Sequence, residues 1–331
     1  MHRNLWIALL AASSLQVASA LPAADLKRGF VLVANQQSAS VSLIDLEHDT
    51  ARVIAVGAGP HEAVIAPSGR TAVVTIYGVG GAPGNELAVI TLPKGVVTKT
   101  ISLGQYTRPH GAMFLPGDET RVAVTSETTQ NVVLVNLVEG KVEQAIGTTA
   151  GGSHMVAITA DGKRAFTSNI AGGSVSEIDL AGKSLARVIP VAPRVEGIAV
   201  TPDGSAVWAG SNTNGTVSII ETKTGTIAQT LGGFTLPYRL AMSADGKTAI
   251  ICDPQADKIH VADVAQRKVI WTLDNLGSPR GVNIAPDGRT AFVTLAADET
   301  MGVVDLEARK LTRKIKVEKS PDGVWFGPPS R

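Results

Sequence analysis

Seven polar or ionisable residues occupy one recurring position of the chain and are its strongest candidates for chemistry. The position lies eight residues before the end of a short turn, and it returns every 42 residues from residue 154 onward. Three consecutive copies hold a histidine, in a chain of 331 residues with only six histidines. In chain order the set is His61, His110, His154, Glu196, Tyr238, Arg280 and Asp322. Imidazole, carboxylate and guanidinium groups bind ligands and transfer protons, so this set defines a candidate site.

The sequence leaves three interpretations of this set open. In the first, the side chains only hydrogen-bond to one another at a water-filled opening. In the second, a small anion or a side chain of a partner protein binds at His61, His110, His154 and Arg280. In the third, the three histidines bind Zn²⁺ or copper at about 2.0–2.1 Å, and Glu196 is a fourth ligand or a general base.

The segment that must position these residues is clearest at 196–204, which has the sequence EGIAVTPDG. A polar residue is followed by a short apolar run and then by Pro-Asp-Gly. The fixed φ of Pro, the capping side chain of Asp and the tolerance of Gly for positive φ favour a tight turn. The last glycine of this turn recurs at Gly162, Gly204, Gly246 and Gly288, again 42 residues apart. So long a period indicates a repeat architecture.

Each repeat contains four short strands separated by turns, and there are seven repeats. This pattern predicts an all-β, seven-bladed β-propeller with four-stranded antiparallel blades. The chain begins with the second strand of a blade and ends with an innermost strand at Gly323–Gly327. We expect this last strand to join the three N-terminal strands and close the ring. The candidate residues open the innermost strands, which line the central channel, and should therefore form a ring at one mouth.

Recurrence separates scaffold residues from site residues. Eight aspartates recur at equivalent turns and are expected to cap their own backbone; they are Asp45, Asp161, Asp179, Asp203, Asp245, Asp263, Asp287 and Asp305. Other loops place further polar residues near the predicted ring, namely Asn35, Glu127, Asn169, Asn212 and Asp253. The only cysteine, Cys252, is expected to be a buried, inert thiol.

One blade departs from the pattern. An insertion at Tyr77–Glu86 separates its second and third strands, between the blades that supply His61 and His110. We expect this insertion to be a loop, which either folds over the channel as a lid or is a tolerated surface feature.

The repeats resemble the YVTN family of β-propellers, which includes the periplasmic YncE-type proteins. The likeness rests on GIAVTPDG at 197–204, VSLIDL at 41–46, VSEIDL at 175–180 and GVVDL at 302–306, and it covers almost all of 29–330. The Tyr-Val-Thr-Asn motif itself has diverged, to Leu-Val-Ala-Asn at 32–35. The resemblance implies the propeller fold and leaves the activity open.

A shorter match, Pro-His-Gly at 109–111, is similar to lactonase and streptogramin lyase propellers. This resemblance implies a metal-dependent hydrolase or lyase. In such an enzyme the three histidines would hold the metal, Glu196 would move a proton, and Arg280 would bind a carboxylate or an oxyanion.

The first residues have the features of a secretory signal. Arg3 precedes an apolar run from Leu5 to Leu15 and a cleavage motif of small residues that ends at Ala20. We therefore expect a signal peptide at 1–20, a polar leader at 21–28 and one propeller domain at 29–331. The mature protein should be periplasmic or secreted, and no later segment is apolar enough to cross a membrane.

The composition argues against nucleic-acid and membrane partners, because the net charge is only +1 and aromatic residues make up 4% of the chain. The leading hypothesis is an exported, monomeric binding protein. Its ligand, an unknown small molecule or periplasmic protein, would meet the His/Glu/Arg ring. The alternatives are the metal-dependent enzyme and a structural scaffold that binds partners through the sides of its blades.

Overall fold

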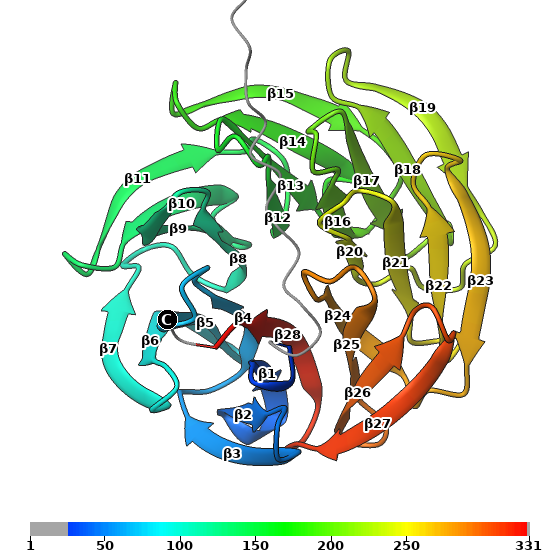
Figure 1. The fold of residues 1–331 in the computed structure, drawn as a ribbon. Coiled ribbons are helices and arrows are strands. Elements are labelled where there is room, and N and C mark those ends of the chain that lie inside the picture. Colours follow the sequence, from blue (N-terminus) through cyan, green and yellow to red (C-terminus); the bar gives the residue numbers. More distant parts are fainter. Residues whose placement is uncertain (1–25, 330–331) are drawn as a thin grey trace, which may run out of the picture.

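The computed structural model describes residues 26–329, which form an all-β propeller (Figure 1). Seven four-stranded antiparallel sheets surround a central axis. We number these blades 1 to 7 in chain order and give their strands from the innermost outward. Blade 1 contains β28 (Pro321–Gly327), β1 (Phe30–Asn35), β2 (Ser40–Asp45) and β3 (Thr50–Ala55). Blade 2 contains β4 (Pro60–Ile65), β5 (Thr71–Val79), β6 (Ala82–Thr91) and β7 (Val96–Ser102).

The other five blades repeat this order. Blade 3 contains β8 (Pro109–Leu115), β9 (Asp118–Ser126), β10 (Asn131–Asn136) and β11 (Lys141–Gly147). Blade 4 contains β12 (Ser153–Ile158), β13 (Arg164–Asn169), β14 (Ser174–Asp179) and β15 (Ser184–Pro190). Blade 5 contains β16 (Val195–Val200), β17 (Ala206–Ser211), β18 (Thr216–Glu221) and β19 (Thr226–Leu231). Blade 6 contains β20 (Leu240–Met242), β21 (Thr248–Asp253), β22 (Lys258–Asp263) and β23 (Lys268–Asp274). Blade 7 contains β24 (Pro279–Ile284), β25 (Thr290–Leu295), β26 (Thr300–Asp305) and β27 (Lys310–Lys316).

The ring closes as the sequence predicts. The C-terminal strand β28 pairs antiparallel with β1 and forms one sheet with β1, β2 and β3. The red and blue ends of the chain therefore meet in Figure 1. β28 begins at Pro321, two residues earlier than expected, and it therefore includes the candidate site residue Asp322. Leu26, the first described residue, is buried in the core cluster that contains Phe326.

Burial follows the position of a strand within its blade. β17, the second strand of blade 5, is buried along its whole length, whereas the outermost strand β27 alternates between exposed and partly buried residues before Ile315. This contrast arises because the inner strands are covered on both faces by neighbouring blades. The apolar core therefore lies between the blades and leaves the channel free for polar side chains.

A β-bulge places the site residues on six of the seven innermost strands. In blade 4, Ser153 pairs with Asn169 and Val156 with Thr167, so His154 and Met155 together face Ser168. Two residues that oppose one bend the strand and re-aim its side chains. The recurring bulge explains why a polar residue can open an otherwise apolar strand and face the channel.

Hydroxyl groups opposite these bulges join neighbouring blades. Thr125 accepts a hydrogen bond from the backbone N–H of Gly111 in its own blade and donates one to the carbonyl of His154 in the next blade, at 2.8 and 2.6 Å. Equivalent pairs of bonds are made by Thr75, Ser168 and Thr294. These hydroxyls fix the backbone of the candidate residues from blade to blade.

The recurring aspartates cap turns, as predicted. Asp203 accepts bonds from the Thr201 hydroxyl and the Ser205 N–H, at 2.6 and 3.0 Å. The corresponding backbone bonds are made by Asp45, Asp161, Asp179, Asp245, Asp263, Asp287 and Asp305. The expected signal peptide lies outside the described residues. Within 26–329, no helix is long and apolar enough to cross a membrane.

Candidate functional site

The structure places most of the predicted ring in a connected set of contacts at the channel mouth. His110, His154, Glu196 and Asp322 are buried, whereas His61, Tyr238 and Arg280 are partly exposed. The members do not form one uniform ring. They divide into a row of imidazoles, a group of buried charges and a more open edge.

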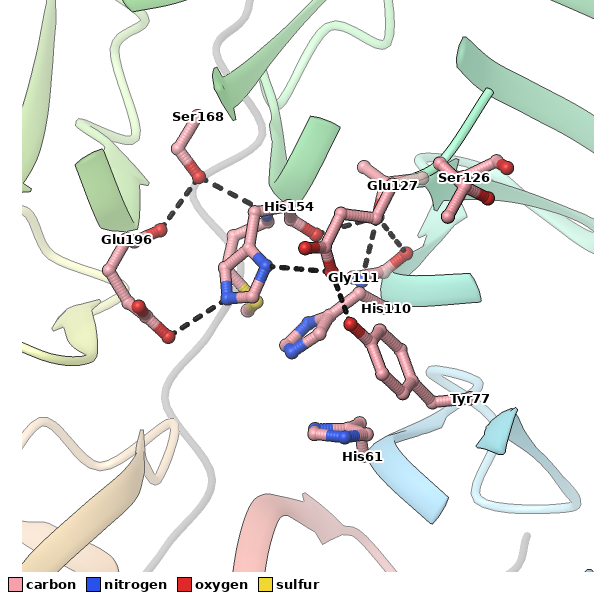
Figure 2. Close-up of polar contacts among 12 residues, drawn as sticks. His61, Tyr77, His110, Gly111, Ser126, Glu127, His154, Ser168 and Glu196 are labelled. Atoms are coloured by element: carbon pink, nitrogen blue, oxygen red, sulfur yellow. Dashed lines mark hydrogen bonds and ion pairs between the residues drawn. The ribbon is translucent and has the colours of Figure 1, made fainter. Parts of the chain in front are cut away.

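The three histidines lie side by side in a row (Figure 2). The ring centroids of His61 and His110 are 4.5 Å apart, and those of His110 and His154 are 3.7 Å apart. Their planes are tilted by 41° and 36°, so neighbouring rings overlap rather than surround a common point. Burial lowers the pKa of His110 well below its usual value, and the neighbouring His154 adds to this effect. A neutral His110 thus separates the other two rings.

This arrangement does not support the predicted three-histidine metal site. Ligands of one Zn²⁺ or copper ion must direct their lone pairs to a single point. Among residues 26–329, no group of three or more His, Cys, Asp or Glu side chains is arranged so that it could hold a metal ion. The rings pack closely against one another, with centroids 4.5 and 3.7 Å apart, instead of surrounding one ion.

His154 lies between two carboxylates. Its Nε2 is 2.8 Å from Glu196, and its Nδ1 is 3.5 Å from Glu127, which also accepts a 2.8 Å hydrogen bond from Tyr77 (Figure 2). Burial alone would lower the pKa of His154, but Glu196 and Glu127 raise it to about 9. His154 is therefore a buried imidazolium at neutral pH.

Arg239 is the principal residue that the sequence interpretation missed. Its guanidinium lies 2.9 Å from Glu196 of blade 5, 3.1 Å from Glu62 of blade 2 and 3.9 Å from Asp322 of blade 1. Because Arg239 belongs to blade 6, its contact with Glu196 joins neighbouring blades, whereas its contacts with Glu62 and Asp322 connect non-adjacent blades. Arg239 is buried, with 4% of its surface exposed.

A sequence signal for Arg239 and Glu62 does exist, one position after the predicted ring. That position is glycine in four blades, at Gly111, Gly197, Gly281 and Gly323. A Cβ atom at Gly323 would lie 2.6 Å from the Glu62 carboxylate, so its absence makes room for that side chain. Glu62 and Arg239 break the glycine pattern with opposite charges. The position after each ring residue therefore carries site information as well as the ring position itself.

The buried charges neutralise one another. Burial would raise the pKa of Glu196, but His154 and Arg239 lower it to about 2. Burial would also raise the pKa of Asp322, but a 3.2 Å hydrogen bond from His61 and the nearby Arg239 lower it. Burial raises the pKa of Glu62, and this effect is larger than the lowering by the nearby Arg239 guanidinium. Each buried cation thus has carboxylate partners within the protein.

These contacts leave the predicted catalytic roles without support. Glu196 accepts bonds from His154, Arg239 and Asn212, so its oxygens are already engaged. Arg280 donates to the Ser320 hydroxyl at 3.1 Å and lies at the edge of the network. Tyr238 packs under the Arg239 guanidinium, 4.4 Å from its ring centre.

The other polar residues proposed from the loops divide into two groups. Glu127 and Asn212 join the channel network. Asn35 and Asn169 bind serine hydroxyls within their own blades, and Asp253 accepts backbone N–H bonds from Thr235 and Leu236. Cys252 is fully buried and its pKa is raised by burial, as expected for an inert thiol.

The insertion in blade 2 is an extension of two strands rather than a loop. Gly78 pairs with Pro83 and Val79 with Ala82, so β5 and β6 continue as a hairpin beyond the body of the blade. Glycine is required at position 78, where φ is +88° and a Cβ atom would meet the backbone of residues 82–84. The hairpin brings Tyr77 against His61, with ring centroids 4.3 Å apart.

A cavity of about 430 Å³ lies between this hairpin and blade 1. Of the seven predicted ring residues, only His61 lines it. The complete lining is Gln36, Gln37, Ala39, Ala58, Gly59, His61, Tyr77, Gly78, Val79, Gly80 and Arg108. A volume of this size suits a small molecule. The accessible part of the mouth is thus displaced from the buried charges toward blades 1 and 2.

Solved structures support the fold. The chain is similar to the structure of Kuenenia stuttgartiensis hydrazine synthase, with a TM-score of 0.73 and 19% sequence identity over 85% of this chain and 93% of that chain. It is also similar to a functionally unknown protein from Desulfotomaculum acetoxidans, with a TM-score of 0.77 and 16% identity over 91% of this chain and 99% of that one. No family model matches the chain, and no curated protein is detectably similar to it. At these identities the likeness concerns the propeller fold alone.

Proposed function

We propose that this chain is an exported binding protein of the YVTN-repeat, YncE-like type, and that it holds a small molecule in the cavity beside His61. The observation that carries the proposal is the 430 Å³ cavity at the channel mouth, lined by the hairpin that only blade 2 possesses. Binding sites in repeat folds are commonly built where one repeat departs from the others.

The charge arrangement favours binding at this cavity over chemistry in the channel. The buried cations Arg239 and His154 already contact carboxylates, and neutral His110 is covered by the rings on both sides. A ligand that entered the channel would have to displace these contacts. A ligand in the cavity would meet His61, Tyr77 and Arg108 without breaking any buried ion pair.

Export and the monomeric state are parts of the same proposal. They rest on the features of residues 1–20 and on the closed ring, which leaves only short outer strand edges for pairing with other chains. Cell fractionation and the mass of the purified protein in solution test these two points.

Filling the cavity tests the binding function. Ala58 lines the cavity, and Pro193 occupies the equivalent place in blade 5, three residues before its ring residue. Wild type, Ala58→Trp and Pro193→Trp are dialysed against the small-molecule fraction of a cell-envelope extract, and retained compounds are identified by native mass spectrometry. We expect compounds that wild type and Pro193→Trp retain and Ala58→Trp loses. The same set of compounds on all three proteins would refute the proposal.

A further inference from the structure

The cations at the channel mouth differ from those inside the channel. Arg239 and His154 contact carboxylates, whereas Arg108 forms no ion pair with any acidic side chain within residues 26–329. Its guanidinium donates to the carbonyl of Gly80 at 2.5 Å and lies over the ring of Tyr77, 4.8 Å from its centre. Arg108 is therefore held in place at the cavity wall by a backbone carbonyl and an aromatic ring rather than by a carboxylate.

The rest of the cavity wall carries no negative charge. None of its lining residues is acidic. Tyr77 donates its hydroxyl to Glu127, and its side chain forms part of the cavity wall. Val79, which is 54% exposed, adds an apolar surface on the hairpin. The cavity thus combines one fixed guanidinium with an aromatic and an aliphatic surface.

A hydrogen-bonded chain orients the other polar groups of this wall. Arg280 donates to Ser320, and the Ser320 hydroxyl donates to the side-chain oxygen of Gln36 at 3.3 Å. Gln36 must then direct its amide N–H toward His61, whose Nε2 lies 2.9 Å away. His61 accepts this bond at Nε2 and donates from Nδ1 to Asp322. These hydrogen bonds engage the polar groups of Gln36 and His61, and Arg108 is the one arginine or lysine among the lining residues.

We propose that the ligand of this cavity is a small organic carboxylate. Its carboxylate pairs with the Arg108 guanidinium, whose planar fork matches the two oxygens, and its body packs against Tyr77 and Val79. This inference rests on the proposed binding function and goes beyond it by naming the ligand chemistry. A cationic ligand is disfavoured, because it would meet Arg108 without a compensating acid in the wall.

Benzoate, benzamide and benzamidine provide a test, since they share one planar body and differ in charge. Binding of each probe to the full-length protein is measured by isothermal titration calorimetry. Arg194 supplies a matched control for Arg108: both residues stand two positions before a ring residue, and both have a left-handed backbone, with φ of 54° and 52°. Arg194 does not line the cavity.

We expect benzoate to bind, benzamide to bind about tenfold more weakly, and benzamidine not to bind. Arg108→Gln should weaken benzoate binding about tenfold, whereas Arg194→Gln should leave it within about twofold of wild type. Equal affinity for benzoate and benzamide, or an equal response of the two variants, would overturn the carboxylate inference. So would the absence of benzoate binding. In each of these cases the retention experiment with Ala58→Trp decides separately whether the cavity binds other molecules.

Discussion

Two groups of carboxylates in this propeller make different kinds of contact. Asp203, one of the recurring aspartates, bonds to Thr201 and Ser205, each two residues away. Glu196 bonds to His154 and Arg239, which lie 42 and 43 positions away in the neighbouring blades. The turn carboxylates therefore act within one repeat, and the channel carboxylates act between repeats.

This difference teaches what recurrence in a repeat sequence means. A local turn needs the same residue in every blade, because every blade has the same turn to cap. A contact across the channel needs complementary residues in different blades, so its members cannot recur. Glu62 and Arg239, 177 positions apart, are the clearest example. Recurrence therefore marks scaffold, and charged exceptions to recurrence mark contacts that hold the ring together or bind ligands.

Removal of the central cation should have the largest effect. Arg239→Met leaves the carboxylates of Glu62, Glu196 and Asp322 without their shared partner, so we expect a loss of about 3–5 kcal/mol in the free energy of unfolding. Urea denaturation measures this loss. Arg289→Met is the control, because Arg289 pairs with Asp305 and Glu307 on the surface, where solvent screens the charges, and its loss should be far smaller. Equal losses in the two variants would show that the buried contacts of Arg239 stabilise the fold no more than a surface ion pair does.

The buried imidazolium should make stability depend on pH. His154 has a pKa of about 9 in the folded protein, above its usual value of 6.5, so the folded state binds this proton more tightly than the unfolded chain. Its stabilising contribution is complete below pH 6.5 and disappears as the pH rises through 9. The loss is at most about 3–4 kcal/mol, for a shift from 6.5 to about 9 at about 1.4 kcal/mol per pKa unit. Urea midpoints measured from pH 6 to pH 10 should fall in wild type and vary less in His154→Gln; parallel curves would contradict this assignment.

The hydroxyls that join blades should rank next. Thr125→Val removes the partner of the Gly111 N–H and of the His154 carbonyl while keeping the shape of the side chain. We expect a loss of about 1–3 kcal/mol in unfolding free energy, because buried backbone groups remain unpaired. A matched Thr98→Val change on the outer strand β7, where the hydroxyl makes only long bonds of 3.4 and 3.5 Å, should cost less. A larger loss in the outer-strand variant would refute the role of the bulge hydroxyls.

The turn carboxylates should show the smallest effect. Asp203→Ala removes bonds confined to a single turn, so we expect a loss of about 1 kcal/mol, also measured in urea. The variant should retain benzoate binding, because the turn lies outside the cavity. A loss as large as that of Arg239→Met would erase the distinction between the two groups of carboxylates.

The repeat pattern was sufficient to predict the fold and to put six of the seven ring residues on innermost strands. Pro-Asp-Gly and related turns, spaced by 42 residues at Gly162, Gly204, Gly246 and Gly288, mark the repeats, and the pairing of β28 with β1 follows from counting strands. The cavity was not predictable, because it depends on how far β5 and β6 remain paired beyond Ile76. Nor was the close packing of the histidine rings predictable, since their shared position in sequence does not determine how their rings pack. Arg239 was not predicted for a different reason: it stands one position after the predicted ring residue Tyr238, outside the recurring ring position.

The central claim is that the channel charges form a closed network and that ligands meet the mouth at His61 and Arg108. Nitrogen NMR of protein labelled at its histidine rings tests both halves at once, at pH 7.5 with and without benzoate. We expect His154 to give imidazolium signals in both samples, His110 to remain neutral, and the ring signals of His61 to shift when benzoate is added. A neutral His154, or a change in its charge on adding benzoate while His61 is unaffected, would contradict the account.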